Sequence, residues 1–107
     1  MKRVGMTWRV YPEHWEAYKH IHLNPWPELL EAIQAVGIHN YSIFALGNRM
    51  FAYMEVAGDD LGAALGRLAA TEVYKRWAEV VGPWLMPEAV DGCGVQFLEI
   101  EPIFYCP

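Results

Sequence analysis

The sequence predicts an α+β domain in which helices cover one face of a four-stranded antiparallel sheet. Segments with alternating apolar residues, typical of strands, are interleaved with segments of helical periodicity. Two of the strand-like segments meet at Gly47-Asn48, a pair that tolerates the positive φ of a tight hairpin. With 107 residues the chain has room for one domain of this kind, which we expect to span residues 1–107.

The first strand and the first helix are expected within residues 4–22. Residues 4–10 alternate between apolar side chains and smaller or polar ones, which predicts a half-buried strand. Pro12 ends this strand and opens a helix, because proline fits a first turn but not a helix interior. At a spacing of four residues, His14, Tyr18 and His22 would form one stripe of the helix, which ends near His22.

A second helix follows a break in the backbone. Pro25 and Pro27 bracket Trp26, so the chain must leave one helix and start another near Pro27. Gly37 is a typical residue for the end of this second helix. Its apolar residues recur at helical spacing: Leu29, Leu30, Ile33 and Val36.

The middle of the chain predicts a β-hairpin, with strands over residues 38–46 and 50–56. Alternation places His39, Tyr41 and Ile43 on one face of the first strand. The opposite face would carry Asn40, Ser42 and Phe44.

The C-terminal half predicts two more helical segments and a last strand. Gly58-Asp59-Asp60 indicates a turn and cap before a helix over residues 61–70. A further helix starts at Thr71 and runs to Leu85, with Tyr74, Trp77 and Val81 on one face. Residues 88–94 are expected to form a loop, and residues 95–105 the last strand.

This order of elements is that of the ferredoxin-like sheet, in which helices cover one face and leave the other open. A hydrophobic content of 54% is high for so short a chain and predicts a further buried surface. A homodimer of the dimeric α+β barrel type, formed through the open face, explains that excess.

Composition excludes several classes of partner. The net charge is −5 with acids and bases scattered, so no basic patch for nucleic acid is expected. No apolar run reaches the roughly 18 residues of a membrane span, and the polar start is not typical of a secretory signal. Cys93 and Cys106 do not form a disulfide framework or a C-x-x-C motif. We therefore expect a cytoplasmic protein without a membrane partner.

The space between the helices and the sheet is the expected pocket. Tyr18 and His22 share a helix face, and His22 is the better acid or base because its ordinary pKa is near neutral. Tyr41 and Trp77 come from other elements and can converge on the same space. His20 and His22 would point to opposite sides of the helix, so no metal pair is expected. No nucleotide or other cofactor motif occurs.

An ordered set of short segments, spread over nearly the whole chain, resembles the L-rhamnose mutarotase family. The segments are Val10-Tyr-Pro-Glu, Tyr18 four residues before His22, Trp26-Pro-Glu-Leu29, Gly37-Ile-His-Asn-Tyr-Ser-Ile43, Thr71-Glu-Val-Tyr-Lys-Arg-Trp77 and Phe104-Tyr-Cys-Pro107. The resemblance implies a small dimeric isomerase that interconverts the α and β anomers of a 6-deoxy-L-sugar, L-rhamnose first, without metal or cofactor.

The resemblance also implies roles for residues. His22 matches the family's proton donor, and Tyr18, Tyr41 and Trp77 match positions that hold the sugar. Trp26 is included among the substrate-binding residues, although it is also suited to bracing the helix break.

Two departures from the family pattern affect the substrate more than the reaction. Leu23 separates His22 from Asn24-Pro25, and Ala78 follows Trp77 where a second tryptophan is common. A missing ring would weaken discrimination between L-rhamnose and another sugar such as L-fucose. Two other classes share such folds and aromatic pockets: cofactor-free monooxygenases and non-catalytic ligand-binding proteins.

Overall fold

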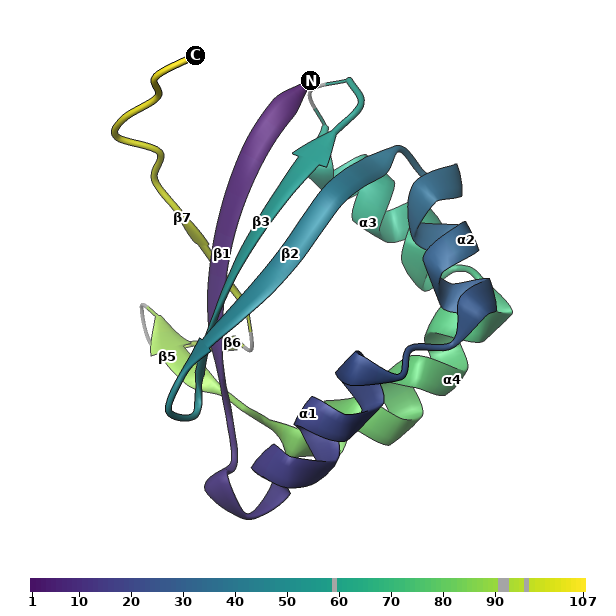
Figure 1. The fold of residues 1–107 in the computed structure, drawn as a ribbon, viewed down its shortest axis with the longest axis vertical. Coiled ribbons are helices and arrows are strands. Elements are labelled where there is room, and N and C mark those ends of the chain that lie inside the picture. The colour runs from purple at the N-terminus through teal and green to yellow at the C-terminus, as the bar shows by residue number, and fades with distance from the viewer. Residues whose placement is uncertain (59, 91–92, 96) are drawn as a thin grey trace.

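Four α-helices pack against one face of an antiparallel sheet in the computed structural model, which describes residues 1–58, 60–90, 93–95 and 97–107 (Figure 1). In chain order the elements are β1 (Lys2–Val10), the 3-10 helix η1 (Pro12–His14), α1 (Trp15–Leu23), α2 (Pro27–Ala35), β2 (Ile38–Leu46), β3 (Arg49–Val56), α3 (Leu61–Ala69), α4 (Glu72–Val81), the 3-10 helix η2 (Gly82–Trp84), β4 (Leu85–Met86), β5 (Glu88–Val90), β6 (Cys93–Val95) and β7 (Leu98–Ile100). The strand order β2-β3-β1-β4, with β7 also paired to β1, confirms the predicted ferredoxin-like class.

The centre of the sheet is formed by β1 and β3, which pair along their whole length from Lys2 and Val56 to Arg9 and Arg49. The predicted hairpin between β2 and β3 is confirmed, and Gly47 in its turn has a φ of 61°. Asn48 ties this turn to the end of β1, because its Nδ2 donates to the Val10 carbonyl oxygen at 2.9 Å.

A bulge in β2 changes which residues share a face. The pairing register shifts between His39 and Ser42, and Asn40 has a φ of 50°. Two residues of β2 therefore stand opposite one residue of β3. The prediction that His39 shares a face with Ile43 is wrong: His39 pairs with Glu55, whereas Ile43 pairs with Ala52, whose side chain is buried on the helix-covered face.

The first helical segment is shorter than predicted. Pro12 starts only the 3-10 turn η1, and His14 lies at the junction with α1 with φ −106° and ψ 3°. The His14 ring stacks on Trp84 with 6.1 Å between ring centroids, so it does not continue the stripe of Tyr18 and His22. Helix α1 ends at Leu23, close to the predicted end at His22.

Side-chain caps begin both C-terminal helices, and the predicted cap before the first of them is confirmed. Asp60 Oδ1 accepts from the Ala63 amide at 2.9 Å at the start of α3, and Asp59 lies outside the described residues. Thr71 Oγ1 accepts from the Tyr74 amide at 3.3 Å at the start of α4. Helix α4 ends at Val81 and not at Leu85, because Pro83 has no amide hydrogen for a helical bond and the chain turns as η2.

The predicted long last strand over residues 95–105 is wrong. Two short strands share the free edge of β1: β4 pairs with residues 9–10 and β7 pairs with residues 5–7. The predicted loop over residues 88–94 contains β5 and part of β6, which pair as a hairpin. Pro102 cannot donate to a strand ladder, and residues 101–107 form neither helix nor strand.

The β5 strand is anchored to the sheet by charge. Glu88 Oε1 accepts from Arg9 Nε at 2.8 Å and from Arg49 Nη2 at 2.7 Å. The side chain of Cys93 lies outside the described residues, and Cys106 is an exposed free thiol.

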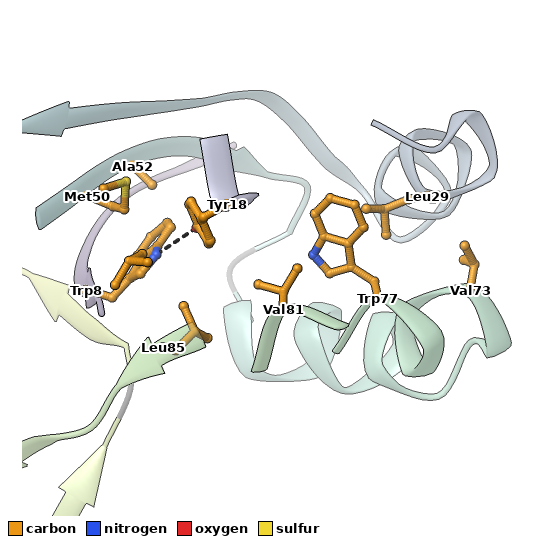
Figure 2. Close-up of a cluster of buried hydrophobic side chains, with 10 residues drawn as sticks. Trp8, Tyr18, Leu29, Met50, Ala52, Val73, Trp77, Val81 and Leu85 are labelled. Carbon is orange, nitrogen blue, oxygen red and sulfur yellow. Dashed lines mark hydrogen bonds between the residues drawn. The ribbon is translucent and has the colours of Figure 1, made fainter. Parts of the chain in front are cut away.

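The core fills the space between the inner sheet face and the helices. Its larger cluster combines side chains from β1, β3, β4, α1, α2 and α4 (Figure 2). A smaller cluster lies beside it and consists of Val4, Ile38, Met54, Val56, Ala64 and Leu68. Within the described ranges, no helix has the length and apolar character needed to span a membrane.

Candidate active site

A cavity of about 930 Å³ lies between the inner sheet face and the helices. Its size is at the upper end of the range for small-molecule sites. Tyr18 and His22 from α1, Tyr41 from β2 and Trp77 from α4 all line it, so four of the five expected site residues converge there.

Tyr18 is held in place by a buried hydrogen bond. Its side chain is 3% exposed, and its hydroxyl oxygen accepts from Trp8 Nε1 at 2.9 Å (Figure 2). Since the indole can only donate, the Tyr18 hydroxyl keeps its own hydrogen for another acceptor. Burial raises the pKa of Tyr18 to about 12, so this hydrogen remains bound near neutral pH.

The hydrogen-bond partner of His22 fixes which ring nitrogen is protonated. Nδ1 lies 2.8 Å from the carbonyl oxygen of Tyr18, and a carbonyl oxygen can only accept, so Nδ1 carries the hydrogen. Burial lowers the pKa of His22 below its usual value, and this hydrogen bond offsets the effect only in part. The resting imidazole is therefore neutral near pH 7 and has a lone pair on Nε2.

Aromatic rings enclose His22 on two sides. The ring centroids of Tyr18 and His22 are 4.1 Å apart, and the Trp77 ring meets His22 edge-on at 5.2 Å. Trp26 packs at a right angle against Trp77, also at 5.2 Å, but does not line the cavity in the described part of the chain. Trp26 is the N-cap residue of α2, and its ring contact supports Trp77.

Two further phenols share the cavity wall. Tyr41 is 37% exposed as a whole residue, yet its hydroxyl end is buried, and this burial raises the pKa of Tyr41, with further contributions from Tyr18 and Tyr74. Burial also raises the pKa of Tyr74, which lines the same cavity. The sequence places Tyr74 on one helix face with Trp77 and Val81, but no sequence signal assigns it to the site.

The chemistry of this wall is that of a site for a neutral polar molecule. Its lining includes the neutral His22 imidazole, three phenol hydroxyls and the Trp77 indole, together with His39 and the exposed Lys19. Among the described residues, no three histidine, cysteine or acidic side chains come together as a metal site would require. Such a set of groups can exchange protons with a ligand and hold its hydroxyl groups and its C–H surfaces.

Comparisons with known proteins agree on one family. A family model described as L-rhamnose mutarotase matches residues 3–106. The chain is 36% identical to an L-rhamnose mutarotase of Bacillus subtilis (strain 168) and 38% identical to one of Listeria monocytogenes serovar 1/2a (strain ATCC BAA-679 / EGD-e), with 98% of each chain covered.

Solved structures extend this similarity to three dimensions. The crystal structure of L-rhamnose mutarotase FA22100 from Formosa agariphila matches with a TM-score of 0.77 and 28% identity, covering 100% of both chains. An antibiotic biosynthesis monooxygenase matches with a TM-score of 0.62 and 17% identity, covering 96% of this chain and 99% of that one. The second likeness shows a shared fold only.

Proposed function

Because this chain belongs to the L-rhamnose mutarotase family, we propose that it interconverts the α and β anomers of a 6-deoxy-L-sugar, with L-rhamnose as the first candidate. The observation that carries this proposal is the neutral His22 imidazole, whose Nδ1 is bonded to the Tyr18 carbonyl and whose Nε2 is left for a ligand. We propose L-rhamnose because the similar proteins are named for that sugar.

Mutarotation requires a proton to leave the anomeric hydroxyl and a proton to reach the ring oxygen. Both oxygens are bonded to the same carbon, so one imidazole can serve both. His22 Nε2 first accepts the anomeric proton, which forms an imidazolium that is stabilised at Nδ1 by the Tyr18 carbonyl. It then donates a proton to the ring oxygen as the bond from that oxygen to the anomeric carbon breaks. The open aldehyde rotates, and the same steps in reverse close the ring on its other face.

The remaining wall residues hold and orient the sugar. The Tyr18 and Tyr41 hydroxyls are protonated and donate to sugar oxygens, because burial raises the pKa of both. The Trp77 indole provides an apolar surface against which the C–H face of a pyranose can pack. Trp26 acts on the sugar only through Trp77, since the two rings are in contact.

Saturation-transfer NMR on a panel of sugars tests this function directly. We expect faster exchange between the anomers of L-rhamnose in the presence of the protein, and a comparable rate for L-fucose. The reason for this weak selectivity is Ala78, which lines the cavity and provides no second stacking ring. Strong preference for L-rhamnose over L-fucose would contradict the argument from Ala78, and no exchange with any sugar of the panel would contradict the function.

The two alternative classes give different results in the same samples. A cofactor-free monooxygenase would consume oxygen with a quinol substrate and leave sugar anomers unchanged. A non-catalytic binding protein would bind a sugar without changing the exchange rate.

We also propose that the protein is a homodimer in which the outer face of the sheet of each copy packs on the other. This face carries large apolar side chains that one copy leaves exposed: Phe44 (65%), Leu46 (75%), Phe51 (37%), Tyr53 (37%) and Ile100 (40%). The helices cover only the opposite face (Figure 1). A second copy removes this apolar surface from water, and a two-fold axis lets the same patch serve both copies.

Sedimentation equilibrium checks the dimer. We expect a dimer at micromolar concentration, and a shift toward monomer when Phe44 is replaced by aspartate. Because Phe44 is 65% exposed in one copy, this change leaves the monomer core intact. Val80→Asp, at a 39% exposed position on α4, is the matched control and should remain dimeric. A wild-type protein that sediments as a stable monomer would contradict the proposal.

A further inference from the structure

Tyr74 stands in the wall of the cavity but has no role in the mechanism above. We propose that Tyr74 is a further sugar-binding residue, and that its hydroxyl selects for one ring hydroxyl of the sugar other than the anomeric one. This inference rests on the proposed function, because it assigns a specificity determinant to the same site.

Both the backbone and the ring of Tyr74 are held in place. Its amide donates to Thr71 Oγ1 at 3.3 Å, which holds the first turn of α4 in place. Its half-buried ring packs against both core clusters, so it lies where the two clusters meet. A ring restrained in this way presents its hydroxyl to a ligand at little further cost in conformational entropy.

The hydroxyl of Tyr74, like that of Tyr41, is left without a hydrogen bond to another group in the described part of the protein, whereas two other phenols are bonded. The Tyr18 hydroxyl accepts from Trp8, and the Tyr53 hydroxyl donates to Glu55 Oε2 at 3.0 Å. Within the described ranges, no protein group bonds the Tyr74 hydroxyl, and Tyr74 lines the cavity. Burial raises the pKa of Tyr74, so the group is a neutral hydroxyl that can both donate and accept.

The spacing along α4 determines what this hydroxyl can reach. Trp77 and Ala78 follow Tyr74 by three and four residues, so they lie one turn along the same side of α4. All three residues line the cavity. Trp77 contacts His22, so the anomeric carbon belongs at the Trp77 end of this stripe. Tyr74 lies one turn away, and Ala78 is too small to separate it from the ligand. The group it meets is therefore a hydroxyl on another carbon of the ring.

The test compares Tyr74→Phe, which removes only the hydroxyl, with Tyr11→Phe. Tyr11 is a half-buried tyrosine outside the cavity lining, so it is the matched control. Calorimetric titration measures the affinity for L-rhamnose and for three analogues that each lack one non-anomeric hydroxyl. We expect the wild-type protein to bind one analogue about tenfold more weakly than the parent sugar, the factor given by a single neutral hydrogen bond.

The expected result is loss of that one preference. Tyr74→Phe should bind the parent sugar and this analogue equally, and should keep the wild-type preference at the other two positions. Tyr11→Phe should match the wild type throughout. An equal loss of affinity for all four sugars would show that the ring only supports the cavity and would overturn the proposal, as would unchanged affinities.

Anomer exchange measured by NMR in the same samples separates the two proposals. If the wild type exchanges the anomers but Tyr74→Phe leaves the preference for the parent sugar over the analogue unchanged, only the role of Tyr74 is overturned. Sugar binding with the predicted loss of preference, but without exchange, overturns the mutarotase function and supports the role of Tyr74. Absence of any sugar binding overturns both.

Discussion

Replacing His22 with alanine is expected to lower the rate of anomer exchange by about 10²–10⁴-fold, the range for a positioned acid–base group. The His22 imidazole contacts both Tyr18 and Trp77 in the cavity wall, and it is the group there that can accept a proton while burial keeps the phenols of Tyr18 and Tyr41 protonated. The factor corresponds to about 3–5 kcal/mol in the activation free energy. Saturation-transfer NMR on L-rhamnose measures it.

The control for this variant is His20→Ala, an exposed histidine on the same helix whose exchange rate should stay near that of the wild type. Thermal melting of both variants separates a chemical loss from unfolding. A well-folded His22→Ala protein with full activity would contradict the assignment.

The pH profile of the wild type gives a second reading of His22. The neutral imidazole is the active resting form, and burial lowers its pKa below the usual value of 6.5. The exchange rate should therefore be constant above pH 6.5 and fall as the pH decreases through the lowered pKa. The His20→Ala variant should show the same profile. A rate that rises on acidification would mean that a resting imidazolium is the active form.

Local signals in the sequence were enough to predict most of the fold. The Gly47-Asn48 turn, the caps at Asp60 and Thr71 and the break between Pro25 and Pro27 each depend on residues close together in the chain. These interactions leave a pattern of residue types that can be read without knowing the tertiary structure.

The predictions are wrong where residues far apart in the chain determine the strand register and the strand length. The extra residue at Asn40 can only be recognised from the register against β3, and it moves His39 to the other face. The last strand is predicted too long because β4 and β7 share one edge of β1, which leaves only residues 5–7 for β7. Alternation within a segment predicts a strand but not how many residues of the partner strand are available to pair with it.

The site shows the same division. The spacing of Tyr18 and His22 is enough to predict that they share a helix face, but the protonated nitrogen of His22 depends on a backbone carbonyl that only the folded helix brings to Nδ1. The sequence places Tyr74 on one helix face with Trp77 and Val81 but does not assign it to the site, since apolar packing and cavity lining give the same helical spacing. Whether a buried phenol has a protein partner is visible only in three dimensions.

Trp8 links the stability of the fold to the site, and replacing it with alanine is expected to lower the free energy of unfolding by about 3–5 kcal/mol. Its side chain is 2% exposed and belongs to the larger core cluster (Figure 2). The substitution removes this apolar contact area and also the Nε1 donor to the Tyr18 hydroxyl. For a domain with a total stability of about 5–15 kcal/mol this is a large fraction. Denaturation with urea, followed by circular dichroism, measures the loss.

A second pair of variants separates packing from hydrogen bonding at Trp8. Trp8→Phe keeps a ring in the core but removes the donor, and Tyr18→Phe removes the acceptor, so each should cost about 1–3 kcal/mol from the unpaired partner. Trp84→Phe is the control: Trp84 is half-buried, and in the part of the chain that the structure describes its Nε1 makes no hydrogen bond. If the Trp8–Tyr18 bond matters, the double variant should cost less than the sum of the two single variants. Additive losses would show that Trp8 stabilises the domain by packing alone and does not hold Tyr18 in the site.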